Sequence, residues 1–304
     1  MKNLSKTLHP MTIGDILDRS IQLYRSNFLK FIGIVLLVKG PYLILGYILG
    51  YIFTALIETF FTGTSSASGV GATQMDYGIS ASVVLLIRLL EILFVGPILI
   101  AAITMAISER FLDRDIGVIE AYKKILRRFL PLLGTILLTG ALIATVLIGC
   151  GFLGVSMLTA GSQPGLIMVM IGLILSAVLW IWYTFIPQTV VLEGEGGLSA
   201  MKRSKYLVKG HFVKAFVLLI LVYIAMALIA EIVSFGIMRG LFFLGQYSGP
   251  LAEGASNVLS VLLEPFRIAA ITLLYYDFRI RKEGFDLEIM AEELESDMRD
   301  DYYA

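Results

Sequence analysis

The sequence predicts an all-α integral membrane protein with six transmembrane helices in three repeated units. Hydrophobic residues make up 58% of the 304 residues and charged residues only 16%, whereas soluble domains lie nearer one half and one quarter. The mean hydropathy is +0.85. The apolar residues are concentrated in six runs, each long enough for the ~20 residues that cross a bilayer. A short basic segment with helical periodicity precedes each pair of runs.

The first predicted unit covers about residues 12–112. Thr12 and Asp15 have the pattern of a helix N-cap with an acid in the first turn. An amphipathic helix over residues 16–28 follows, and then a first span over residues 29–56. Within that span, Lys39-Gly40-Pro41 predicts a kink or a break. Residues 58–78 contain no Lys or Arg and predict an outer loop before the second span, residues 79–107.

The second predicted unit, about residues 115–192, begins with a shortened amphipathic segment at residues 121–129. Spans over residues 130–158 and 166–191 follow. The sequence AGSQPG at residues 160–165 predicts the tight turn that joins these two spans.

The third predicted unit, about residues 197–280, begins with the amphipathic segment SAMKRSKYLVKGHF at residues 199–212. Drawn as a helix, its apolar residues share an arc of about 140° and its basic residues occupy the other side. Spans over residues 213–243 and 258–278 follow. The three units make one transmembrane domain, residues 1–282, and residues 283–304 form an acidic cytoplasmic tail. The tail carries a thin apolar stripe at helical spacing, formed by Leu287, Met290, Leu294 and Met298. The stripe would dock a partner or fold back on the basic helices; the other interpretation is a solvated helix.

Two matching stretches support the repeat. Residues 97–104, PILIAAIT, align with residues 265–272, PFRIAAIT, and Pro187 gives the middle unit its own span proline. Three equivalent prolines predict three equivalent bends around a pseudo-symmetry axis. Repeats of this kind occur in transporters, and they also occur in passive membrane modules.

The distribution of Lys and Arg predicts the orientation. These residues gather in residues 1–30, 109–128, 192–214 and 279–282, so we expect both termini in the cytoplasm and a multi-pass protein of the inner (plasma) membrane. The three amphipathic helices would then lie in the membrane plane, and each basic residue near anionic lipid headgroups contributes about 1 kcal/mol. The predicted membrane-surface residues are Arg19, Arg25, Lys123, Lys124, Arg127, Lys202, Arg203, Lys205 and Lys209.

Residues 14–28, GDILDRSIQLYRSNF, residues 192–212 and residues 274–286, LYYDFRIRKEGFD, resemble a family of bacterial and archaeal membrane proteins. That family is similar to the membrane domain of glycerophosphoryl diester phosphodiesterase. The resemblance implies a polytopic membrane module. The phosphodiesterase of the named enzymes is a separate soluble barrel, and only a short tail is expected after residue 278. The resemblance therefore implies no catalytic residue.

Charged side chains within spans are costly and by default indicate function. Arg88 and Glu91 are three residues apart on one predicted helix, as are Glu264 and Arg267, so each pair can neutralise itself across one turn. Glu231 would meet one of these arginines or be protonated. One interpretation is a polar cavity between the units; the other is structural ion pairs and snorkelling side chains. The candidate intramembrane polar cluster is Lys39, Arg88, Glu91, Glu231, Glu264 and Arg267.

The remaining residues exclude several kinds of site. One cysteine, Cys150, and two histidines, His9 and His211, predict no disulfide, no metal site and no cofactor. A net charge of zero argues against nucleic acid as a partner. The glycines of LEGEGG, residues 192–197, lack the spacing of a phosphate loop and predict a flexible lead-in. A solvated anchor, or a headgroup- or partner-binding site, is predicted for Asp277, Arg279, Arg281, Lys282 and Glu283.

The sequence thus predicts a non-enzymatic membrane protein that moves a solute or a lipid, or that organises the envelope. One alternative is an integral enzyme that acts on lipid or isoprenoid phosphates. Another is a scaffold that binds a protein partner through the acidic tail.

Overall fold

The computed structural model describes residues 9–57, 85, 87–112, 117–240 and 248–291, and this part of the chain contains no strand. Its elements are α1 (Ile13–Ser26), α2 (Phe28–Ile57), the π-helix η3 (Glu91–Val95), α4 (Gly96–Phe111), α5 (Val118–Leu126), α6 (Phe129–Thr159), α7 (Pro164–Trp182), α8 (Ile186–Gln188), the π-helix η4 (Thr189–Glu193), α9 (Gly197–Val208), α10 (Phe212–Gly240) and α11 (Ser248–Glu283).

Six helical segments are long and apolar enough to cross a bilayer, which indicates a multi-pass membrane protein. They are Phe28–Gly46, Ile87–Phe111, Phe129–Thr159, Pro164–Glu193, Phe212–Gly240 and Gly254–Glu283. Of the kink or break predicted at Lys39-Gly40-Pro41, the break is wrong, because α2 continues through Pro41. A proline removes only one backbone donor, so the helix can persist around it. The predicted outer loop, residues 58–78, lies outside the described residues.

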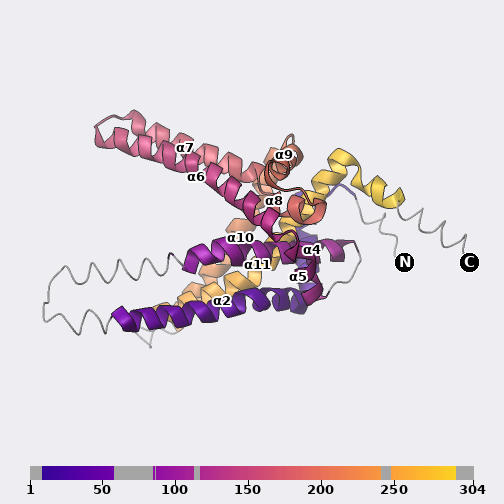
Figure 1. Ribbon diagram of the computed structural model, residues 1–304, viewed down its shortest axis with the longest axis horizontal. Coiled ribbons are helices and arrows are strands. Elements are labelled where there is room, and N and C mark those ends of the chain that lie inside the picture. Colours follow the sequence, from indigo (N-terminus) through magenta and orange to yellow (C-terminus); the bar gives the residue numbers. More distant parts are fainter. Residues whose placement is uncertain (1–8, 58–84, 86, 113–116, 241–247, 292–304) are drawn as a thin grey trace, which may run out of the picture.

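The three short helices α1, α5 and α9 lie at one end of the bundle, which we call the basal end (Figure 1). Their apolar faces pack on protein: Ile16 of α1, Ala121 of α5 and Leu207 of α9 are fully or almost fully buried. The sequence had assigned these faces to the bilayer. Protein covers them because α1 lies against α11, α5 against α4, and α9 against α6.

The N-cap predicted for α1 is present. The Thr12 hydroxyl accepts a hydrogen bond from the backbone N–H of Asp15, and the Asp15 carboxylate accepts one from the Thr12 backbone. Two hydrogen bonds from Thr12 lower the pKa of Asp15; the bond from the Thr12 backbone has the larger effect and the bond from its side chain the smaller. This capping box fixes the start of α1.

The core is centred on α4 and α11, the two helices that carry the sequence IAAIT. Ala101 and Ala102 of α4 and Ala269 and Ala270 of α11 are fully buried. Small side chains allow membrane helices to approach closely. Nearer the basal end, the hydroxyls of Ser108 and Tyr276 share a 2.6 Å hydrogen bond between the same two helices. This centre supports the site described below.

The α6–α7 hairpin is tightly packed within itself but diverges from the other long helices (Figure 1). Glycines form the contact between its two helices. A Cβ atom added at Gly172 would lie 2.5 Å from the Cβ of Cys150, and one at Gly165 would meet the backbone of Gly154 and Leu158. The two helices of the hairpin therefore form one closely packed unit, which contacts the rest of the protein near the basal end.

We predict opposite effects of two glycine-to-alanine changes in this hairpin. Gly165→Ala forces backbone atoms apart, and overpacking of this kind costs about 1–3 kcal/mol. At Gly151 an added Cβ meets nothing within 4 Å, so Gly151→Ala gains the usual helix propensity of about 0.5–1 kcal/mol. Thermal unfolding in detergent measures both. Equal melting temperatures for the two variants would contradict the close packing at Gly165.

Candidate functional site

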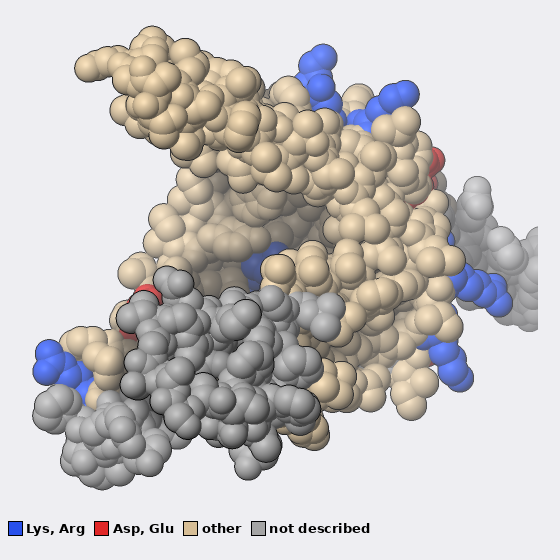
Figure 2. Space-filling model, turned by 60° about the vertical axis from the view of Figure 1, so that its left-hand side comes forward, with Lys and Arg blue, Asp and Glu red and all other residues tan. Residues whose placement is uncertain are grey.

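A pocket of about 270 Å³ lies where the α6–α7 hairpin diverges from α4, α10 and α11; we call it the hollow. Figure 2 shows the molecular surface deeply hollowed on this side, with basic atoms in its floor. Its wall is predominantly apolar. The lining residues are Ile100, Ile136, Thr139, Gly140, Ile143, Trp180, Tyr183, Thr184, Ile186, Pro187, Gln188, Tyr223, Arg267, Ile268 and Ile271.

The hollow lies in the basal half of α6 and α10. Thr139 follows Phe129, the first residue of α6, by ten residues, and Tyr223 follows Phe212, the first residue of α10, by eleven. At 1.5 Å per residue, these positions are about 15–17 Å from the basal ends of their helices. This distance is close to half of the about 30 Å thickness of the hydrocarbon core of a bilayer.

The Arg267 side chain is the basic group that lines the hollow. It is ion-paired with Glu264, one turn earlier on α11, and its Nη1 donates a 3.2 Å hydrogen bond to the Tyr223 hydroxyl of α10. The Tyr223 ring contacts Trp180 of α7 with centroids 5.3 Å apart. This chain of contacts connects the hairpin with α10 and α11.

The six residues of the predicted intramembrane cluster do not form a single site. Glu91, the first residue of η3, lies 3.5 Å from the Lys39 Nζ and 3.0 Å from the Arg88 Nη1, and it accepts a 3.1 Å hydrogen bond from Tyr42. These groups join α2 to η3. Within the described part of the chain, no hydrogen bond or ion pair connects them to the Glu264–Arg267 pair. Glu231 is exposed on α10 and forms no ion pair with the other five.

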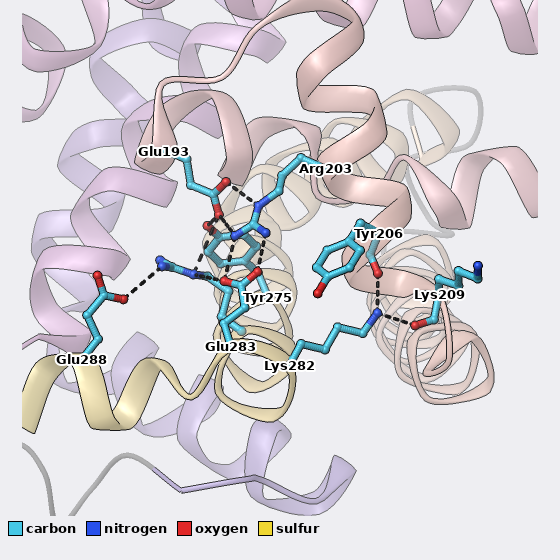
Figure 3. Close-up of polar contacts among 9 residues, drawn as sticks. Glu193, Arg203, Tyr206, Lys209, Tyr275, Lys282, Glu283 and Glu288 are labelled. Carbon is cyan, nitrogen blue, oxygen red and sulfur yellow. Dashed lines mark hydrogen bonds and ion pairs between the residues drawn. The ribbon is translucent and has the colours of Figure 1, made fainter.

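A second polar centre lies at the basal end (Figure 3). Arg203 of α9 donates two hydrogen bonds to the Glu193 carboxylate of η4, at 2.6 and 2.8 Å. The Tyr275 hydroxyl also donates to Glu193, and Arg203 donates to Glu283 at the end of α11. Arg279 is ion-paired with Glu283 at 3.2 Å. We call these five residues the basal network.

The basal network corrects the prediction for the LEGEGG segment. The sequence predicts a flexible lead-in there, but η4 holds Glu193 against α9 and Gly194 turns the chain with φ of +82°. Arg203, one of the predicted membrane-surface residues, contacts two carboxylates. Hydrogen bonds to Glu193 and Glu283 raise its pKa. No short-range sequence signal marks contacts between residues 193, 203 and 283.

Asp277 was predicted to be part of a solvated exit from the last span, and that prediction is wrong. Its side chain is fully buried and accepts hydrogen bonds from the Met11 backbone at 2.7 Å, from Lys214 at 2.6 Å and from Arg281 at 3.0 Å. A buried carboxylate requires such partners. Lys282 donates to the backbone carbonyls of Tyr206 and Lys209.

The start of the acidic tail also differs from the prediction. After Gly284, residues 285–291 form a short helix that buries Phe285 and Ile289 against the core. Leu287 of the predicted stripe is 66% exposed and Met290 is 38% exposed, so the opposite face is the one that packs. Leu294 and Met298 lie outside the described residues.

The other predicted membrane-surface residues remain near the surface. Lys123, Lys124 and Arg127 line a shallow pocket of about 410 Å³ together with Arg128 and Met105. Lys124 is ion-paired with Glu109 at 3.1 Å, and the hydrogen bond to Glu109 raises its pKa. The Lys205 ammonium lies 4.2 Å from the Trp182 ring, and Arg19 donates to the Met11 sulfur. Arg25, Lys202 and Lys209 are exposed.

Residues 73–278 match the family model described as Domain of unknown function (DUF7847). The chain belongs to this family. No curated protein and no solved structure matches it. The matched residues include the whole lining of the hollow and Glu193, Arg203 and Tyr275, whereas α1, Arg279 and Glu283 lie outside them.

The described residues contain no group of three or more His, Cys, Asp or Glu side chains placed to hold a metal ion. The lining of the hollow offers apolar contact, hydroxyl and amide groups, and the guanidinium of Arg267, which is ion-paired with Glu264. This combination fits a molecule with a long apolar part and a small polar part.

We predict that Arg203→Met destabilises the protein by about 1–3 kcal/mol, because it leaves the Glu193 and Glu283 carboxylates without their shared partner. The matched control is Lys202→Met, since the neighbouring Lys202 is exposed and surface changes usually stay within about 0.5 kcal/mol. Thermal unfolding measures both variants. If Arg203→Met melted at the same temperature as Lys202→Met and the unchanged protein, the basal network would have no structural role.

His211 gives a pH-dependent prediction. Burial lowers its pKa, the positive charges of Lys282, Arg281 and Lys214 lower it further, and Asp277 raises it. The unfolded chain thus binds the proton better than the folded protein. The contribution to stability is complete above about pH 6.5 and is lost as the pH falls below that value.

Melting temperatures at about pH 7.5 and about pH 5.5 test this sign. The drop on acidification should be smaller in His211→Phe than in the unchanged protein, because Phe keeps the ring contact with Phe278 and does not titrate. His9→Gln, at an exposed histidine, serves as the control. An equal drop in all three proteins would contradict the account.

Proposed function

We propose that the protein binds an amphipathic, lipid-like molecule in the hollow and moves it within the plasma membrane, without a catalytic step of its own. The observation that carries this proposal is the position of the hollow. In the membrane position that we propose, this apolar pocket between the diverging hairpin and the core would lie near mid-bilayer depth and would be reached from the lipid phase. Membrane transporters commonly place their substrate sites near the midplane, between repeated units.

The three-unit organisation that the sequence predicts supports the proposal. α1, α5 and α9 each precede a long helix, and the proline-bearing segments of α4, α8 and α11 contribute Ile100, Pro187 and Arg267 to the hollow. A binding site formed where three related units meet is the arrangement expected of a repeat-built transporter.

The orientation that we propose places both termini and the basal end in the cytoplasm. The exposed basic side chains of α1, α5 and α9 would then meet anionic headgroups of the inner leaflet. The pocket lined by Lys123, Lys124, Arg127 and Arg128 gathers four basic side chains on this surface. The apolar faces of these helices pack on protein, so the contact with the membrane is made by charge at the basal surface.

The two alternatives make different demands on the structure. An enzyme acting on lipid phosphates requires a nucleophile or general base beside the substrate. At the hollow, Glu264 and Arg267 are ion-paired with each other, so neither is free for that role. A scaffold that works through the tail requires a free tail surface; residues 285–291 are partly occupied by their contact with the core, and Glu288 is ion-paired with Arg279 at 3.7 Å.

The test is to fill the hollow. Gly140 lines it with open space around its Cα, so Gly140→Phe places a ring where the ligand should lie. We predict that a dansyl-labelled fatty amphiphile, detected by energy transfer from Trp180, binds about tenfold more weakly to this variant. Gly149→Phe is the control, because Gly149 is also on α6 with open space but outside the hollow. Equal binding by both variants would refute a ligand site in the hollow.

A further inference from the structure

The shallow pocket at the end of α5 is a site separate from the hollow, and we call it the basic pocket. It has a volume of about 410 Å³ and is lined by Met105, Lys123, Lys124, Arg127 and Arg128. The four basic residues are two pairs at a spacing of four, so their side chains emerge on one side of the helix. Like charges at this spacing repel each other. A concave surface that holds them together is therefore suited to an anion.

Two of these basic groups already have protein partners. Lys124 is ion-paired with Glu109 at 3.1 Å and with Glu120 at 3.6 Å. The Arg128 guanidinium donates a hydrogen bond to the backbone carbonyl of Val191 in η4. These contacts hold the wall of the basic pocket in place and offset part of its charge.

The other two basic groups, Lys123 and Arg127, are exposed, and within the part of the chain that the structure describes neither forms a hydrogen bond or an ion pair. The corresponding helix α9 differs. There Arg203 is paired with two carboxylates, and the Lys205 ammonium lies 4.2 Å from the centre of the Trp182 ring. The basic pocket thus keeps two cations whose charge no described carboxylate offsets.

The basic pocket lies at the level where two spans end. Phe129, which follows the four basic residues, is the first residue of the α6 span, and Met105 is within two turns of Phe111, the last residue of another span. Leu126 and Leu130, on either side of the two arginines, are 77% and 75% exposed. Exposed leucines beside basic side chains are typical of the boundary between lipid headgroups and acyl chains. These neighbours favour a ligand that joins an anionic group to an apolar part.

We propose that the basic pocket binds one anionic phospholipid through its phosphate group, as basic pockets between membrane helices do. The Arg127 guanidinium donates to two phosphate oxygens, and the Lys123 ammonium adds a second positive charge. The acyl chains lie beside Leu126 and Leu130. This inference goes beyond the proposed function, because the site is outside the hollow. A single bound lipid also differs from the general attraction of basic residues to an anionic membrane.

Thermal unfolding in dodecyl maltoside micelles tests the inference, because a ligand that binds only the folded protein raises the melting temperature. Dioleoyl phosphatidic acid, dioleoyl phosphatidylcholine and inorganic phosphate are added separately at the same concentration. We expect phosphatidic acid to raise the melting temperature by at least about 2 °C and the other two to leave it almost unchanged. No rise with phosphatidic acid, or an equal rise with phosphatidylcholine, would overturn the inference. An equal rise with inorganic phosphate would overturn the assignment to a lipid.

Two double variants locate the effect, and each removes two positive charges. Lys123→Met/Arg127→Met removes the two unpaired cations of the basic pocket and should lose most of the rise. Lys202→Met/Lys209→Met removes two exposed lysines at α9 and should keep it. An equal rise in both variants would place the lipid elsewhere, and an equal loss would indicate general surface charge; either result overturns the inference.

Two controls keep the result clear. Since Lys123 and Arg127 have no described partner to lose, their replacement should not lower the melting temperature in micelles without added lipid, and the comparison of ligands uses the unchanged protein. Gly140→Phe, which fills the hollow, should keep the rise with phosphatidic acid. If the rise is absent while Gly140→Phe still weakens binding of the labelled amphiphile, this inference fails and the proposed function stands.

Discussion

The ion pair between Glu193 and Arg203 is the interaction on which the arrangement of the helices depends. Glu193 ends the helical segment that returns from the α6–α7 hairpin, and Arg203 lies on the short helix that leads into α10. Both meet the end of α11 through Tyr275 and Glu283. Three parts of the chain, η4, α9 and the end of α11, are thus fixed at one point. A two-bond contact between a guanidinium and a carboxylate also fixes their relative orientation, which a single charge contact does not.

The hollow is a consequence of where the hairpin is held. α6 and α7 contact α8, α9 and η4 near the basal end. Beyond that end, close contacts at glycines pack α6 and α7 against each other. The distal part of this hairpin diverges from α10 and α11, so the space between them widens from the basal end outward (Figure 1). Trp180 and Tyr223 form the contact between α7 and α10 beside the hollow. The same contact places the Arg267–Glu264 pair at the wall.

The parts of this structure that follow from local pattern could be predicted from the sequence. The six apolar segments, the capping box at Thr12 and Asp15, and the pairing of residues three apart, such as Glu264 and Arg267, depend on neighbours along one helix. The apolar faces of the short helices could also be predicted from the sequence, but the surface that covers these faces could not. A membrane and the end of a helical bundle cover the same kind of face, and periodicity does not distinguish them.

Contacts between distant residues could not be predicted. Glu193 and Glu283 are ninety residues apart, and Asp277 meets Met11 across almost the whole chain. Nothing in the spacing of LEGEGG indicates that its first glutamate accepts two hydrogen bonds from Arg203. The predicted polar cluster is divided between two places in the structure. The positions of the spans in the sequence do not indicate which helices lie next to one another.

The central claim is that the α6–α7 hairpin stands apart from the core in a bilayer and leaves the hollow open to lipid. Spin labels at Phe152 of α6 and Ile232 of α10, both exposed, report this separation most directly once Cys150 is replaced by serine. In lipid nanodiscs, double electron–electron resonance should give a distance distribution centred on the separation in the structure. A distribution collapsed to the short distance of two helices packed side by side would contradict the account, because the hollow would then be closed.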